Sequence, residues 1–143
     1  MALSENTVGE VLAALGERTP APASGAATAL TAAFAAALVE LSARFAGDEP
    51  SVVRAKALWS RLTELADEDV AAYGAFVAER SDANRARIVA VPEEIASHAD
   101  EIAELAMHVR GQLRGAVVGD ADAAALLARA AATVSRRLVE LNR

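Results

Sequence analysis

The sequence predicts an all-α fold, a single-domain helical bundle of about five long helices plus a short one. Hydrophobic residues make up 54% of the 143-residue chain, with 38 alanines, whereas aromatic residues make up only 3%. Ala, Leu, Glu and Arg favour helices, while strands favour β-branched and aromatic residues, so an all-β fold is disfavoured. Apolar residues also recur at helical spacing between clear chain breaks.

The first predicted helix covers residues 4–15. Thr7 and Glu10 have the spacing of a capping box, and Gly16 suits the position just after a helix. Residues 17–23 then form a loop that is interrupted by two prolines. The apolar residues of this helix share one face: Val8, Val11, Leu12 and Leu15.

The second predicted helix begins near Ser24, a good N-cap residue, and ends before Gly47. Its large apolar residues recur at helical spacing: Leu30, Phe34, Leu38, Leu41 and Phe45. Another side, with Gly25, Ala29, Ala33 and Ala37, has little side-chain bulk, so a partner helix can approach closely. A chain this poor in large apolar side chains is expected to form a homodimer, which buries more surface.

The third predicted helix covers residues 51–80, after a junction formed by Asp48, Glu49 and Pro50. Its apolar stripe also carries Asp69 and Tyr73, which are one helical turn apart. The stripe is completed by apolar residues at helical spacing: Ala55, Leu58, Leu62, Leu65 and Phe76.

Residues 81–84 form the next break, and a short helical piece is expected before Pro92. Proline suits the first turn of a helix, so Pro92 is predicted to begin a fifth helix. Residues 115–119 form the last loop, and Asp120 is predicted to cap the sixth helix. No linker divides residues 1–143, so one domain is expected.

Composition and charge exclude several classes of protein and site. Without cysteine, the chain has no disulfide, Cys-based zinc site or thiol nucleophile. A net charge of -6 argues against a nucleic-acid partner. Residues 1–16 lack a basic signal-peptide start, and the uncharged run 25–39 is short for a membrane span. A cytoplasmic protein without a membrane partner is therefore expected.

The two histidines do not form a recognisable metal motif. His98 and His108 each follow a glutamate by four residues, but the repeated Glu-x-x-His spacing of helical metal sites is missing. Solvated pairs on helix faces explain them better, so no metal site is predicted.

Three features are candidates for catalysis: the start of the second helix, Asp69 and Asp120. Ser24 and Gly25 place free backbone N–H groups at the start of an uncharged helix, which can hold an anion, or Ser24 is only a cap. Asp69 on an apolar stripe can have a raised pKa, as a general acid or base requires, or it stays in water. Asp120 is a third candidate, or it is only a cap. Arg85 and Arg87 bind a carboxylate or a phosphate, or they are only solvated.

Four segments in this order resemble the cyclodeaminase/cyclohydrolase family, which includes formiminotransferase-cyclodeaminase and methenyltetrahydrofolate cyclohydrolases. Thr19–Leu30 resembles its proline- and glycine-rich loop, and Leu65–Tyr73 its Asp-x-x-Ala-Tyr stretch. Gly119–Leu126 resembles its Ser-Asp-Ala segment, and Leu138–Asn142 ends in the Asn common there.

The sequence also departs from the family pattern. Ala23 and Ser24 replace two loop glycines, and Ala26 stands where the family has a serine. Residues 115–118 lack the family's asparagines, and the segment around residues 78–90 is shorter.

The resemblance implies chemistry on the one-carbon bridge of a tetrahydrofolate derivative, with no cofactor required. Asp69 or Asp120 would transfer the proton. The expected substrate-binding residues are Ser24, Gly25, Thr28, Tyr73, Arg85 and Arg87. The alternative is a non-catalytic helical dimer of the same fold that binds another small ligand or a protein partner.

Overall fold

A computed structural model describes residues 2–143, and in these residues it shows helices and no strand. The predicted all-α fold class is therefore confirmed. The 3-10 helices are η1 (Leu3–Glu5) and η2 (Gly115–Val117). The α-helices are α1 (Val8–Gly16), α2 (Ser24–Ala46), α3 (Glu49–Ala78), α4 (Asp82–Arg110) and α5 (Val118–Asn142). Met1 lies outside the described residues, and the single domain of residues 1–143 stays a prediction.

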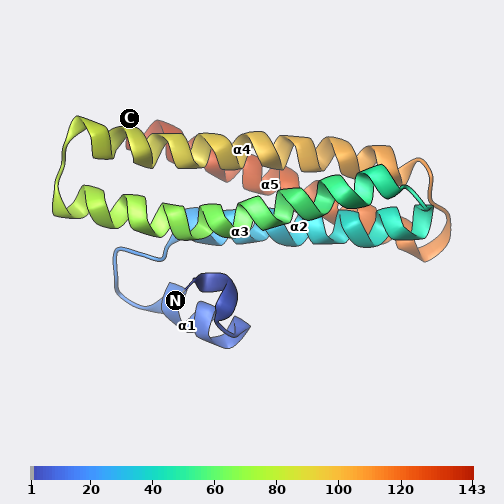
Figure 1. Ribbon diagram of the computed structural model, residues 1–143, viewed down its shortest axis with the longest axis horizontal. Coiled ribbons are helices and arrows are strands. Elements are labelled where there is room, and N and C mark those ends of the chain that lie inside the picture. Colours follow the sequence, from blue (N-terminus) through green and yellow to red (C-terminus); the bar gives the residue numbers. More distant parts are fainter. Residues whose placement is uncertain (1) are drawn as a thin grey trace.

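The four long helices α2 to α5 form an antiparallel bundle, and the short helix α1 lies beside it on a loop (Figure 1). Helix α2 packs against α3 and α5, and α4 packs against α5 and α3. The start of α2 lies beside α3 at Asp69, and α3 continues beyond it to Ala78. Both lie toward one end of the bundle, while the start of α5 lies at the other end (Figure 1).

Several helix ends differ from the predictions. The capping box of Thr7 and Glu10 is confirmed, but α1 begins only at Val8, after η1. Gly16 is the last residue of α1 and not its cap, and Ala23 rather than Ser24 precedes α2 as N-cap. Gly47 ends α2 in the left-handed conformation, with φ 69°, which glycine adopts at little cost.

Helices α3 and α5 both begin earlier than predicted. Asp48 accepts a hydrogen bond from the backbone N–H of Ser51 as the N-cap of α3, so Pro50 lies in the first turn, where proline is tolerated. Helix α5 begins at Val118, directly after η2, and Asp120 is a first-turn residue rather than the predicted cap. An acidic side chain in the first turn still interacts favourably with the positive end of the helix dipole.

The prediction that Pro92 begins a new helix is wrong, because α4 runs through it without a break. A proline inside a helix has no N–H, so the carbonyl four residues earlier, that of Ile88, loses its partner. The side-chain amide of Asn142 donates a hydrogen bond to this Ile88 carbonyl oxygen at 2.8 Å. A residue at the end of α5 thus replaces the missing donor in α4.

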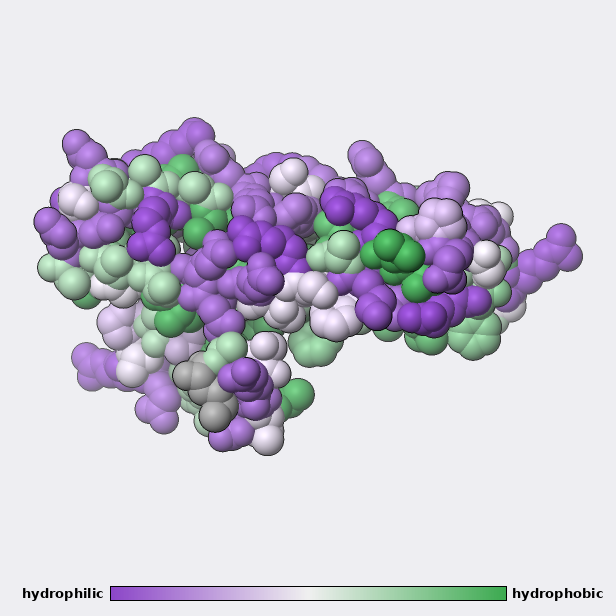
Figure 2. Space-filling model, in the orientation of Figure 1, coloured by the Kyte–Doolittle hydropathy of each residue, from purple (hydrophilic) through white to green (hydrophobic). Residues whose placement is uncertain are grey.

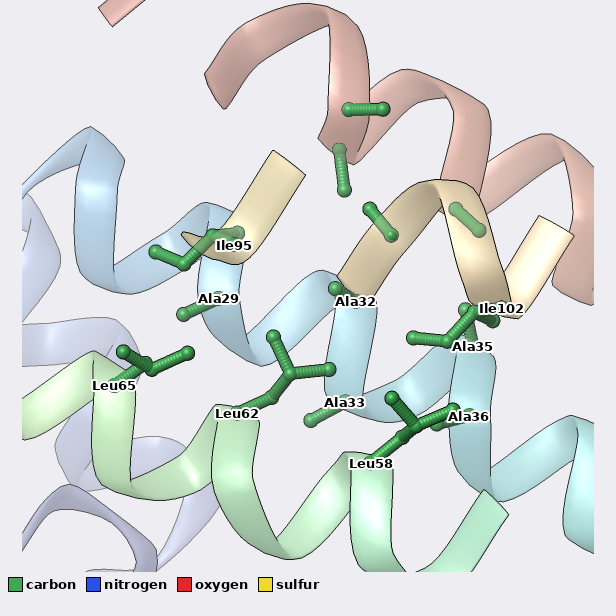
Figure 3. Packing of buried hydrophobic residues seen from close by; sticks show 14 of the residues in the cluster. Ala29, Ala32, Ala33, Ala35, Ala36, Leu58, Leu62, Leu65, Ile95 and Ile102 are labelled. Carbon is green, nitrogen blue, oxygen red and sulfur yellow. The ribbon is translucent and has the colours of Figure 1, made fainter. Parts of the chain in front are cut away.

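Helix α2 turns its alanines toward the core and its large apolar side chains outward. Ala29, Ala32 and Ala36 are fully buried, whereas Phe34 and Phe45 are 62% and 70% exposed. Larger side chains from α3 and α4 point toward the alanines, among them Leu58, Leu62, Leu65, Ile95 and Ile102 (Figure 3). Of the predicted small face, Gly25, Ala29 and Ala33 are buried, whereas Ala37 is exposed. The buried small residues of α2 let α3 approach closely.

By length and composition, α2 is the one helix in residues 2–143 that is apolar enough to cross a membrane. Of its most apolar window, 56% is buried inside the bundle. Helices of protein cores also meet this criterion, so the finding is weak support for a membrane span.

Candidate functional site

The carboxylate of Asp69 on α3 lies directly against the start of α2. A Cβ atom added to Gly25 would overlap both carboxylate oxygens of Asp69. Gly25 is buried and has no side chain, so the carboxylate can approach the backbone of the first helical turn. The structure thus brings together two of the predicted site residues, which are 44 positions apart in the sequence.

Burial raises the pKa of the Asp69 carboxyl above its ordinary value, because the charged form loses contact with water. A hydrogen bond from the backbone N–H of Ala26 acts in the opposite direction and favours the carboxylate. Burial is the larger of the two influences. A carboxyl group in this state can hold or release a proton closer to neutral pH, as a general acid or base requires.

The three consecutive acids Asp67, Glu68 and Asp69 have separate environments. Asp67 accepts a hydrogen bond from the backbone N–H of Leu3 at 2.8 Å and holds η1 against α3. Glu68 forms an ion pair with Arg61 at 2.7 Å. Neighbouring residues of a helix point in different directions, and of these three acids only Asp69 faces the start of α2. Asp69 is therefore the candidate acid.

The other predicted residues at this end of the bundle form the surroundings of Asp69. Tyr73 lies one turn after Asp69 and is 37% exposed, so its ring is accessible to a ligand. Ser24 is exposed at the first position of α2. Thr28 is buried, and its hydroxyl donates to the carbonyl oxygen of Ser24 at 2.6 Å. That donor is therefore occupied within the helix.

Arg85 and Arg87 lie near the start of α4, beyond the end of α3. The guanidinium of Arg85 lies 5.1 Å from the centre of the Phe76 ring and donates to the carbonyl oxygen of Asn142 at 3.3 Å. Phe76 follows Asp69 by seven residues, about 10 Å along the helix. Arg87 is exposed. Both arginines are thus at the same end of the bundle as Asp69 but not in contact with it.

Asp120 is not brought to Asp69 within one chain. Asp69 lies 20 residues after the start of α3, which corresponds to roughly 30 Å along the bundle. Asp120 belongs to the first turn of α5, at the same end as the start of α3 (Figure 1). The two predicted catalytic acids therefore lie near opposite ends of the bundle.

The histidines form pairs with single acids. Nε2 of His98 lies 2.9 Å from Oε2 of Glu94, and Nε2 of His108 lies 3.3 Å from Oδ2 of Asp48. Across residues 2–143, no three His, Asp or Glu side chains come together as potential metal ligands.

Sequence reasoning missed two features. The first is a groove of about 590 Å³ between α1 and α2, lined almost entirely by apolar side chains and not by Asp69. The apolar stripes of α1 and α2 are visible in the sequence, and they could have indicated this groove. The second is the role of Asn142 beside Pro92, for which a proline within a helical pattern is the only local signal.

A family model described as formiminotransferase-cyclodeaminase matches residues 7–143. The crystal structure of formiminotetrahydrofolate cyclodeaminase from Thermotoga maritima matches with a TM-score of 0.90 and 21% sequence identity. The match covers 97% of this chain and 79% of the Thermotoga chain. No curated protein matches the sequence.

Proposed function

The chain belongs to the formiminotransferase-cyclodeaminase family, and from this membership we propose that it acts on the one-carbon bridge of a tetrahydrofolate derivative. The activity is that of a cyclodeaminase or of a methenyltetrahydrofolate cyclohydrolase. The observation that carries the proposal is the half-buried Asp69 carboxyl at the start of α2, with its raised pKa.

Both reactions pass through a tetrahedral carbon between two nitrogens. In the cyclodeaminase reaction, N10 attacks the formimino carbon, and the amino group leaves as ammonia after it is protonated. In the cyclohydrolase reaction, water adds to the methenyl carbon and one carbon–nitrogen bond breaks as that nitrogen gains a proton. Each route balances with substrate, water and protons, so no cofactor is needed. Asp69 is proposed as the group that transfers the proton.

The surroundings of Asp69 suit a folate that extends along the end of the bundle. The backbone N–H groups at Ser24 and Gly25 offer hydrogen bonds to the pterin, and the exposed ring of Tyr73 offers a stacking surface. Thr28 contributes as an acceptor. Arg85 or Arg87 would hold the carboxylates of the glutamate tail, about 10 Å along α3 from the acid.

Asp69→Asn tests the proposal directly. The amide preserves the shape but cannot exchange a proton, so we expect turnover of methenyltetrahydrofolate, followed by its near-ultraviolet absorbance, to fall by about 10²- to 10⁴-fold. Gly25→Ala should also lower turnover, because the added Cβ displaces the carboxylate. The matched control is Asp67→Asn, two residues away and bonded to Leu3, which should retain activity. Unchanged turnover in Asp69→Asn would eliminate the assignment.

A second proposal is a non-catalytic protein of the same fold that binds another small ligand or a protein partner. Two observations favour it: Ala23 and Ala26 occupy positions where the family has glycine and serine, and Asp120 lies far from Asp69. Absence of any acceleration above the spontaneous rate, together with no folate binding by calorimetry, would favour this alternative. Folate binding with turnover would eliminate it.

The remaining expectations belong to the same proposal. The chain is proposed to act in the cytoplasm on a small-molecule folate, with no nucleic-acid or membrane partner. The homodimer predicted from its composition remains a proposal too.

A further inference from the structure

The end of α5 is attached to α4 by both the side chain and the backbone of one residue, Asn142. Its side-chain amide donates a hydrogen bond to the carbonyl oxygen of Ile88 at 2.8 Å. Its backbone carbonyl oxygen accepts a hydrogen bond from Nη1 of Arg85 at 3.3 Å. Asn142 therefore connects the backbone of α4 to an exposed cationic side chain of the same helix.

Arg85 is held from a second direction by the ring of Phe76. The centre of this ring lies 5.1 Å from the guanidinium carbon, which is within the range of a cation–π contact. Phe76 is buried, so the ring is a fixed surface. An arginine side chain loses conformational entropy when it binds a ligand, and a side chain that is already restrained loses less.

The remaining hydrogen-bond donors of Arg85 are available to a ligand. Within residues 2–143, the carbonyl oxygen of Asn142 is the one hydrogen-bond partner of this guanidinium, and no acid forms an ion pair with it. The bond to Asn142 uses Nη1, so the edge formed by Nε and Nη2 is left. A carboxylate can accept two parallel hydrogen bonds from this edge of a guanidinium.

Another arginine of the chain already binds a carboxylate in this way. Nε and Nη2 of Arg61 donate to the two carboxylate oxygens of Glu94 at 2.7 and 3.0 Å. This pair links α3 and α4, and the face over these two helices has hydrophilic residues along its middle (Figure 2). Arg61 takes its carboxylate from the chain itself. For Arg85, the carboxylate of a ligand would take the same place.

A surface cleft next to Arg85 gives a ligand room. The end of α3 and the start of α4 extend beyond the start of α2 and the end of α5 (Figure 1). In this region a cleft of about 510 Å³ contains two arginines and two acids, Arg85 and Arg143 with Asp82 and Glu93. Arg143 pairs with Glu93 at 3.5 Å. Arg85 is therefore the cation of this cleft that a carboxylate can reach without displacing an ion pair.

Arg85 also lies on the same side of α3 as the candidate acid. Phe76, which supports Arg85, follows Asp69 by seven residues and so shares its face of the helix, about 10 Å further along. In a folate, the p-aminobenzoyl group separates the reacting nitrogen from the glutamate, so the acid and the cation for the tail must be apart. Arg87 points to another side of α4, because residues two positions apart do not share a helix face.

We propose that Asn142 is a positioning residue, which holds Arg85 in the orientation that binds the glutamate tail of the substrate. The side-chain bond to Ile88 fixes the last turn of α5, and the backbone carbonyl of that turn fixes Nη1 of Arg85. The edge formed by Nε and Nη2 then binds a carboxylate of the tail. This inference rests on the proposed folate activity, and it assigns the tail to Arg85 rather than to Arg87.

The first test compares methenyltetrahydrofolate with methenyltetrahydropteroate, which lacks the glutamate. Arg85→Ala should raise KM for methenyltetrahydrofolate by about 10- to 100-fold at nearly constant kcat, because the tail contact is made equally in the ground and transition states. KM for the pteroate compound should not change. The control is Arg80→Ala, an equal loss of charge 5.4 Å from the same Phe76 ring, which should leave both KM values nearly unchanged. Equal KM values in the two variants would overturn the assignment of the tail to Arg85.

The second test separates positioning by Asn142 from its support of the fold. Asn142→Ala should raise KM for methenyltetrahydrofolate by about 3- to 10-fold and leave KM for the pteroate compound unchanged. In a Pro92→Ala background, a backbone N–H at position 92 can donate to Ile88, so the fold no longer depends on the Asn142 amide. The rise in KM should persist there, because Arg85 still loses its fixed acceptor. A rise that disappears in this background, or that is equal for both substrates, would show structural support alone and overturn the proposal.

The same measurements distinguish a failure of this inference from a failure of the proposed function. An unchanged chain that neither turns over nor binds the two compounds, by calorimetry, would refute the folate activity and this inference with it. A chain that turns over both compounds with equal KM makes no use of the glutamate, which would overturn the inference alone and leave the role of Asp69 intact. If the chain binds the compounds without turnover, dissociation constants replace KM in every comparison.

Discussion

At the scale of single residues, the site is defined by one carboxyl group in an unfavourable place. Partial burial disfavours the charged form of Asp69, whereas the hydrogen bond from the backbone N–H of Ala26 at the start of α2 favours it. Both Asp69 and Gly25 could be selected from the sequence, one by its apolar stripe and one by its position at a helix start. Their contact could not, because no local spacing relates residues 44 positions apart.

The raised pKa of Asp69 makes a prediction about stability and pH. Because the folded state holds the proton more tightly than the unfolded state, the wild-type chain loses stability as pH rises from the ordinary Asp pKa through the folded value. Asp69→Asn removes that loss. We expect the variant to be the more stable protein in urea unfolding at pH 7, with the difference vanishing below about pH 4.

Asp48 provides the opposite case within the same chain. Hydrogen bonds from the side chains of Ser51 and Gln112 lower its pKa to about 2. Its stabilising effect is therefore present at neutral pH and is lost as pH falls from about 4 toward 2. Asp48→Asn should destabilise the chain at pH 7. The same sign for both variants at pH 7 would contradict the account of Asp69.

At the scale of helices, periodicity predicted α3 and the second half of α4 well, because there the large apolar residues are also the buried ones. In α2 the large apolar residues are not the buried ones. The stripe with the largest side chains faces outward, and the core takes alanines, whose burial cannot be read from size or hydropathy. The low helix propensity of proline also predicted a break at Pro92. Asn142, which supplies the missing hydrogen-bond donor, is 50 residues away in the sequence, so no local pattern reveals it.

Asn142→Ala tests this compensation. The substitution leaves the Ile88 carbonyl without a donor, and we expect it to lower the free energy of unfolding by about 1–2 kcal/mol. In a Pro92→Ala background the backbone N–H of residue 92 is restored and can donate to Ile88, so the loss should be smaller. Thermal unfolding of the four proteins forms the required double-mutant cycle. Equal losses in both backgrounds would exclude a shared role.

At the scale of the whole molecule, a core centred on alanine has little tolerance for added volume. The close approach of α2 and α3 depends on small residues facing Leu58, Leu62 and Leu65 (Figure 3). The fold class followed from composition and periodicity, but the depth of each alanine in the core depended on which helices became neighbours.

Ala32→Leu tests this dependence. Ala32 is fully buried, so the larger side chain must displace neighbouring helices, and we expect a loss of about 1–3 kcal/mol in the free energy of unfolding. This corresponds to roughly 3–10 °C in Tm for a domain of this size. The control is Ala57→Leu at an exposed position of α3, which should change Tm little. A loss of similar size at Ala57 would point to helix propensity rather than packing.

Helix α1 is attached to the bundle weakly enough to unfold by itself. None of its residues is buried, and η1 is joined to the bundle through a hydrogen bond to Asp67. Its backbone amides should therefore exchange with deuterium through local unfolding that leaves α2 to α5 intact. In the free chain α1 should exchange long before the bundle does.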